Sequence, residues 1–200
     1  MPSFLALLIL VAAPTYTLDK KQSELVVKTS KAGFAAALAH NHVIRATELE
    51  GSIGWDPAAP EAASVKVTVQ TAALVVDDPA MRKKHGEPSE LSAGDRKKIT
   101  DAMLDSGQLD VRKFPTISFS STALQKDAKG WLLSGNLTLH GVTKAVKLPV
   151  TIDVKGTALT ADGTLRLRTS DYGIKPYSAA LGAIKNRDEV ELVLHLVGAR

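Results

Sequence analysis

Strict alternation of apolar and polar side chains in the second half of the chain constrains the fold more than any other feature. Leu133, Leu137 and Leu139 share one side of a first run, and polar residues share the other. In a second run, every second residue from Val146 to Val154 is apolar. A period of two predicts β-strands with one buried face and one solvated face. Such strands are typical of antiparallel sheets, because strands of parallel sheets are apolar throughout.

A short turn is expected between these two strands. Gly141 and the pair Thr143-Lys144 lie there and are plausible turn residues. His140 stands beside the turn on the polar face. We expect His140 to have a structural role at the turn, with contact to a ligand head group as the alternative.

The same alternation recurs along the chain and predicts a β-rich fold. We expect roughly eight antiparallel strands, at residues 23–28, 43–55, 64–70, 116–124, 131–139, 145–154, 157–168 and 189–197. Between residues 77 and 107 the sequence is charged and does not alternate, and Ser92 with Asp95 resembles a helix N-cap. We predict a helix over 93–105 and a further helical turn within 77–85. Many strands around one core indicate either a sandwich or a closed barrel.

Length and composition fit one globular domain. The chain has 200 residues, of which 44% are hydrophobic and 23% are charged. It contains no cysteine, which excludes disulfides and thiolate metal sites. The net charge of +4 is modest, and the basic triplets at 82–84 and 96–98 lack accompanying aromatic residues. Nucleic acid is therefore not an expected partner.

The N-terminus carries a targeting signal. Residues 4–13 form a run of ten apolar residues, and Val11-Ala12-Ala13 supplies small residues for cleavage. The run is too short to span a bilayer, which needs about 20 residues. We interpret residues 1–13 as a secretory signal peptide. We therefore expect a periplasmic or otherwise secreted protein without a stable membrane span; the alternative is a buried first strand.

Several segments resemble the YceI-like, polyisoprenoid-binding family. Residues 135–144 (GNLTLHGVTK) are similar to its GxLTxHGVTK signature, and residues 110–119 (DVRKFPTISF) to its DVxKYPTIxF segment. Residues 170–174 (SDYGI) resemble its SDFGI segment, residues 16–19 (YTLD) its opening strand and residues 55–57 (WDP) its second hairpin.

This resemblance covers residues 16–198 in the right order and implies both a fold and a function. The fold is all-β with a helical insertion: an antiparallel eight-stranded, lipocalin-like β-barrel over residues 16–200. Its tunnel would hold a long isoprenoid lipid, and export to the periplasm is usual. The chain departs from the family pattern at Met103, where histidine is common, and at residues 39–42 (AHNH), which replace a more apolar segment.

His40 and His42 are candidate metal ligands. On a strand, residues i and i+2 point the same way, so both imidazoles could meet one metal ion or haem edge. His85, His140 and Glu48 are candidates for a third ligand by residue type only. The alternative is a pair of hydrogen-bonded histidines at a barrel mouth.

The inward-facing apolar residues are the candidate ligand site. Burying a prenyl chain against them gains about 25 cal/mol per Å² of apolar surface. Tyr172, Tyr177 and Trp131 could hydrogen-bond a head group. The candidate ligand-binding residues are Val67, Val69, Ile117, Phe119, Trp131, Leu133, Leu137, Leu148, Leu165, Leu192, Tyr172 and Tyr177.

Catalytic motifs are absent from the sequence. It has no GxSxG elbow, no phosphate-binding glycine-rich loop and no nucleophile with an identifiable base. We expect a non-enzymatic, exported carrier or sequestering protein for a polyisoprenoid or similar long apolar lipid, without a cofactor. Two alternatives stay open: a metal- or haem-linked redox accessory protein using His40 and His42, and a structural or stress-related barrel without ligand. The oligomeric state is open, with a dimer among the options.

Overall fold

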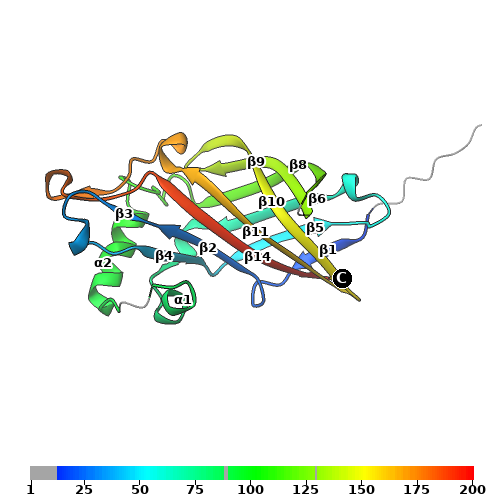
Figure 1. Cartoon of the computed structure of the whole chain (residues 1–200), viewed down its shortest axis with the longest axis horizontal. Helices are drawn as coiled ribbons and strands as arrows, with labels where there is room; N and C mark the ends of the chain where they lie inside the picture. Colours follow the sequence, from blue (N-terminus) through cyan, green and yellow to red (C-terminus); the bar gives the residue numbers. More distant parts are fainter. Residues whose placement is uncertain (1–12, 88–89, 129) are drawn as a thin grey trace, which may run out of the picture.

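An antiparallel β-barrel, closed by pairing of its first and last strands, dominates the structure (Figure 1). The structure is a computed structural model that describes residues 13–87, 90–128 and 130–200. In ring order the strands are β1 (Thr15–Leu18), β5 (Leu49–Gly54), β6 (Ser64–Gln70), β8 (Thr116–Asp127), β9 (Gly130–Leu139), β10 (Val142–Lys155), β11 (Ala158–Arg168) and β14 (Glu189–Ala199). The predicted antiparallel eight-stranded barrel with a helical insertion is confirmed.

Three further strands extend one side of the barrel wall. They are β2 (Glu24–Thr29), β4 (His42–Ala46) and β7 (Leu74–Val76); along the chain, β2 follows β1, β4 precedes β5 and β7 follows β6. The long strand β14 pairs with β1 near its C-terminal end and with β2 through residues 191–195. Strand β7 pairs with β4 and ends the sheet, and within the described residues it does not pair with β8. The barrel is therefore closed at one end and interrupted between β7 and β8 at the other.

Two helices lie at this interrupted end (Figure 1). Helix α1 (Pro79–Lys84) is capped by Asp78, which accepts the Met81 N–H, and α2 (Ala93–Leu104) by Ser92, which accepts the Asp95 N–H. Met81 of α1 packs on Val26 and Val43, on the outer side of β2 and β4. Helix α2 contacts β7, at the edge that lacks a strand partner. No helix among the described residues is long and apolar enough to cross a membrane.

Short elements complete the fold near the same end. A small sheet contains β12 (Ser178–Ala179), β13 (Ile184–Asn186) and β3 (Lys31–Ala32), in that order. The 3₁₀ helices are η1 (Ala36–Leu38), η2 (Pro60–Ala62), η3 (Thr71–Ala73), η4 (Thr169–Tyr172) and η5 (Ala180–Gly182). The sequence prediction of one strand over 43–55 was wrong, because β4 and β5 are separate strands with different partners. The predicted leader, residues 1–13, lies almost wholly outside the described residues.

The β9–β10 turn is tighter than expected. It contains only His140 and Gly141, whose φ angles of 51° and 73° are both in the left-handed region favoured in two-residue hairpins. Thr143 and Lys144, expected in the turn, already belong to β10. His140 Nδ1 lies 3.1 Å from the Tyr172 carbonyl oxygen, and its ring packs on Phe114. These contacts give His140 a structural environment that connects the hairpin to η4.

The closed end of the barrel is packed by large side chains. Tyr16, Ile53 and Leu159 are each at most 2% exposed. The rings of Trp55 and Trp131 meet edge to face, with 5.3 Å between their centroids. Such aromatic contacts add to the stabilisation from buried area. This end is therefore a packed core.

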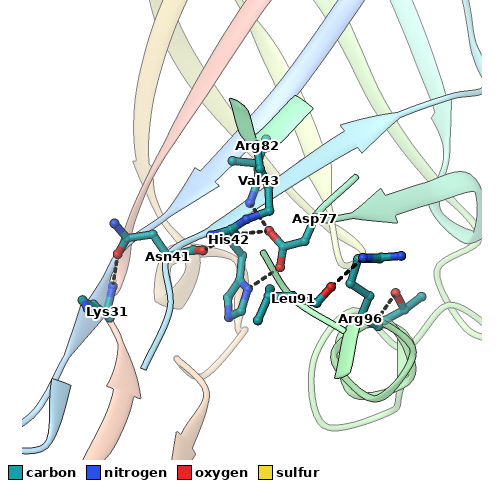
Figure 2. A network of polar contacts seen from close by, with 9 residues as sticks. Lys31, Asn41, His42, Val43, Asp77, Arg82, Leu91 and Arg96 are labelled. Atoms are coloured by element: carbon teal, nitrogen blue, oxygen red, sulfur yellow. Dashed lines mark hydrogen bonds and ion pairs between the residues drawn. The ribbon is translucent and has the colours of Figure 1, made fainter. Parts of the chain in front are cut away.

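A buried ionic network lies at the interrupted end, immediately after β7. Asp77 is fully buried, and its Oδ1 accepts hydrogen bonds from the Val43 N–H (2.9 Å) and from Arg82 Nη1 (2.7 Å). Its Oδ2 lies 2.6 Å from His42 Nδ1. Figure 2 shows the Asp77 carboxylate at the centre of these contacts. The network connects α1 to β4 at the free edge of the sheet.

The environment of Asp77 keeps its carboxyl group ionised. Burial raises the pKa of Asp77, but its three hydrogen-bond donors outweigh the burial and hold the pKa below its ordinary value. The buried charge is thus matched by donors from two elements of secondary structure. Removal of either charge would leave the other buried without this charge partner.

We expect Asp77→Asn to destabilise the protein by about 3 kcal/mol or more, because it leaves the Arg82 guanidinium buried without its charge partner. Asparagine accepts a positive φ readily, so the Asp77 backbone (φ 55°) adds little strain. Urea unfolding measures the loss. The matched control is Asp162→Asn, which breaks an exposed pair with His195 and should cost within about 0.5 kcal/mol. Equal losses in the two variants would contradict this account.

The same network predicts acid sensitivity. Because folding lowers the pKa of Asp77, its carboxylate stabilises the protein above the unfolded-state pKa. That stabilisation is lost as the pH falls through the folded-state pKa. The free energy of unfolding of the wild type should therefore fall more steeply between about pH 5 and pH 3 than that of Asp77→Asn. If the free energy of unfolding fell equally steeply with pH in the two proteins, Asp77 would not be the source of the acid sensitivity.

Candidate ligand-binding cavity

The barrel encloses a cavity of about 410 Å³. It runs from Trp55 and Leu196 in the closed half to Tyr177 and Arg187 beside the small sheet. Every strand of the closed ring except β1 contributes to its walls, together with β2, β4, β7 and α2. This volume falls within the range of small-molecule binding sites.

The walls are apolar because the inward face of each strand carries every second residue. On β10 these residues include Val146, Leu148 and Val150, and on β14 they include Leu192 and Leu194. Leu148 and Leu194 are buried, whereas Leu192 is only half-buried although it points inward. An inward residue stays partly accessible when it faces a hollow instead of a packed neighbour. The alternating pattern therefore builds a lined space along the barrel and not a solid core.

Helix α2 covers the interrupted part of the wall. Ile99, Ala102 and Met103 line the cavity, and their spacing places them on one side of the helix. No residue of α2 is fully buried. This follows from its position, because its apolar side faces the cavity and its other side faces solvent.

Ten of the twelve residues predicted as ligand-binding line this cavity. The ten are Val67, Val69, Ile117, Phe119, Leu133, Leu137, Leu148, Leu165, Leu192 and Tyr177. Trp131 lies outside the lining and packs on Trp55. Tyr172 also lies outside it, buried with Leu137 and Ile174 in a separate cluster. Burial raises the pKa of the Tyr172 phenol, with a smaller contribution from the Asp171 charge.

The structure adds lining residues that the sequence did not single out. Leu25, Val27 and Thr29 of β2 and Ile44 of β4 face the cavity. Their alternation is present in the sequence, but β2 and β4 are short and their barrel positions depend on pairing with β14 and β7. Alternation identifies the inward face of a strand only after its sheet partners are known.

The two candidate metal ligands lie in different environments. His40 precedes β4 and is exposed, so the same-face argument for a strand does not apply to it. His42 lines the cavity and is held by Asp77. Across residues 13–87, 90–128 and 130–200, no three His, Asp or Glu side chains gather into a potential metal site.

The residues considered for a third ligand have other partners. His85 Nε2 lies 3.0 Å from Glu24, and Glu48 pairs with Lys20 at 2.7 Å. His140 contacts the Tyr172 carbonyl. The candidate metal site considered from the sequence is therefore not formed by these side chains.

Comparison with known proteins agrees with this architecture. The family model described as "YceI-like domain" matches residues 16–198. A UPF0312 protein of Pseudomonas aeruginosa (strain LESB58) is 34% identical over 166 residues, which cover 78% of this chain and 73% of that protein. A UPF0312 protein of Pectobacterium carotovorum is 31% identical over 161 residues, covering 76% of this chain and 71% of the relative.

Solved structures share the fold at low sequence identity. Burkholderia cenocepacia BcnA matches with a TM-score of 0.67 and 20% identity, over 90% of this chain and 98% of BcnA. A Campylobacter jejuni YceI protein matches with a TM-score of 0.59 and 15% identity, over 78% of this chain and 84% of that protein. The family model spans nearly all of the described barrel, and the chain belongs to the YceI-like family.

Proposed function

We propose that this protein is an exported carrier or sequestering protein that holds a polyisoprenoid or a similar long apolar lipid inside the barrel. The observation that carries the proposal is the apolar cavity of about 410 Å³ that runs along the barrel. Burial of an apolar chain gains about 25 cal/mol per Å², so such a ligand binds without charged contacts along its length. Membership of the YceI-like family supports the same function.

The shape of the barrel favours a linear ligand that enters from the interrupted end. The closed end is filled by Tyr16, Trp55 and Trp131. At the other end the wall consists of α2, the small sheet and the exposed residue Tyr177. A chain inserted there would place its apolar tail deep in the barrel and leave its head near the helices.

Binding, and not catalysis, is the role that the cavity chemistry supports. The Asp77–His42 pair resembles the base half of a hydrolytic site. Thr29 lies opposite His42 on the neighbouring strand, but its hydroxyl makes no hydrogen bond to the ring among the described contacts. The pair therefore lacks an activated nucleophile in this arrangement.

The two alternatives have less support. A structural barrel without ligand would be expected to have a solidly packed interior, whereas this one is hollow along much of its length. A metal- or haem-linked role for His40 and His42 would need both rings at one site, and only His42 faces the cavity. A carrier function accounts for the hollow directly.

Filling the cavity should weaken ligand uptake. We expect Leu165→Trp to weaken binding of a prenyl lipid by about tenfold or more, because the indole occupies space that the chain would fill. Leu165 lines the cavity, and its neighbour Thr164 points outward and is exposed. Thr164→Trp is therefore a matched control and should bind as the wild type does. Mass spectrometry of lipids extracted from the protein purified from its native host provides the second measurement.

The carrier proposal fails if the purified protein carries no apolar molecule and takes up no prenyl lipid in solution. It also fails if Leu165→Trp and Thr164→Trp bind prenyl lipid equally well, because the chain would then lie outside the barrel.

Export has its own test. The apolar run at residues 4–13 supports removal of residues 1–13 during secretion. Intact-mass measurement of the protein from the periplasmic or extracellular fraction of its host should show a chain that begins at Pro14. A full-length chain found only in the cytoplasm would contradict export and leave the binding proposal unaffected.

A further inference from the structure

One wall of the cavity carries two polar side chains that are not fully used in hydrogen bonding. Thr29 on β2 and His42 on β4 are directly paired across the two strands, and both line the cavity. The Thr29 hydroxyl oxygen is buried, and among the described residues it is the one buried side-chain N or O atom that lacks a hydrogen-bond partner. Buried polar groups in folded proteins are nearly always paired, so an unpaired one beside a cavity indicates a contact for a ligand.

The orientation of His42 leaves one ring nitrogen available. Nδ1 lies 2.6 Å from the Asp77 carboxylate, which can only accept, so Nδ1 carries a hydrogen. Asp77 is itself held by Val43 and Arg82, and this fixes the ring in place. No described residue bonds Nε2. His42 therefore presents a positioned but unused nitrogen beside the Thr29 hydroxyl.

The charged groups around this wall favour a negative partner. The charged residues that line the cavity are Lys98 and Arg187, and no described lining residue is a carboxylate. The Arg187 N–H bonds the carbonyl of Ser30, so Arg187 is next to Thr29 along the wall. Both cations are exposed to solvent, so their attraction for an anion is screened and strengthens the hydrogen bonds of the wall only modestly.

The nearby carboxylates have other partners. Asp77 is paired with Arg82 and His42, and Asp95 is 3.6 Å from the Lys98 ammonium group. Glu87 accepts a hydrogen bond from the Asn41 side chain. Asp95 partly neutralises Lys98, so Arg187 is the main source of positive charge among the residues that line this wall.

We propose that Thr29 and His42 form a head-group site for a ligand whose apolar chain ends in an anionic hydrogen-bond acceptor, a carboxylate or a phosphate. The inference rests on the carrier function proposed above and specifies its ligand. As the anionic head group binds, His42 takes up one proton from solvent at Nε2. The imidazolium is then paired with Asp77 and donates its Nε2–H to a head-group oxygen. Rotation about the Cα–Cβ bond of Thr29 turns its hydroxyl into the cavity as a second donor.

The test compares three probes with the same chain: farnesol, farnesoic acid and farnesyl phosphate. Trp55 lines the cavity, so its fluorescence reports binding of each probe. We expect the wild type to bind at least one of the two anionic probes about tenfold or more tightly than farnesol, as expected for a hydrogen bond to a charged group. The acid and the phosphate distinguish between the two anionic head groups.

Two variants test whether the preference for anionic probes over farnesol arises at Thr29 and His42. His42→Gln should reduce the anion-over-alcohol ratio to about threefold or less, because the glutamine amide can still donate a hydrogen bond but cannot carry a positive charge. Thr29→Val should lower the ratio without loss of stability, because the hydroxyl has no partner to lose in the folded protein. A purely structural role for Thr29 would instead appear as a loss of stability with the ratio unchanged.

Matched controls lie outside the cavity. His195 forms a similar pair with Asp162 at 2.6 Å on the exposed surface, so His195→Gln should keep the wild-type ratio. Thr68 lies between two inward residues of β6 and does not line the cavity, so Thr68→Val should also keep it. These variants separate the head-group site from general effects of the substitutions.

Each outcome decides the proposal. Equal binding of farnesol and both anionic probes, or an unchanged ratio in both His42→Gln and Thr29→Val, overturns the head-group site and leaves the carrier function standing. Failure of all three probes and of longer prenyl lipids to bind overturns the carrier function and, with it, this inference.

Discussion

The structure depends on the pairing of one long strand with two different partners. β14 pairs with β1 at its C-terminal end, which closes the ring, and with β2 farther back, which extends the wall. The continuation through β4 and β7 then stops without reaching β8. A closed ring of eight strands is just large enough to hold one small ligand, and here the interruption widens one end further. The packed closed half, the hollow, and the position of α2 over the gap all follow from this arrangement.

The interruption leaves a free sheet edge, and the buried network centred on Asp77 stabilises it. Asp77 follows β7 directly, bonds the backbone of β4 and receives Arg82 from α1. The same carboxylate holds His42 on the cavity wall. A group that stabilises the edge thus also positions a cavity side chain. In Figure 2, the contacts with α1, with the backbone of β4 and with the imidazole all meet at the Asp77 carboxylate.

Features with a local signal were predictable from the sequence, and features that depend on distant pairing were not. The period-two runs correctly placed β6, β9 and β11, and Ser92 with Asp95 correctly placed the start of α2. Alternation also selected nine residues that line the cavity. Trp131 was wrongly predicted to line the cavity, because its alternation on β9 does not reveal that its side chain packs on Trp55. His40 was wrongly expected on the same strand as His42, because β4 begins only at His42. The Asp77 network joins residues that are 35 positions apart, and no local pattern indicates it.

The most direct measurement of the central claim is a set of nuclear Overhauser contacts between a bound prenyl chain and the protein methyl groups. If the chain lies inside the barrel, its protons should contact the methyl groups of Leu165 and Leu192, which line the cavity on neighbouring strands. They should not contact Val75, which is exposed and lies outside the lining. Contacts confined to outward-facing methyl groups such as Val75, with none to Leu165 or Leu192, would contradict the claim that the hollow of the barrel is the binding site.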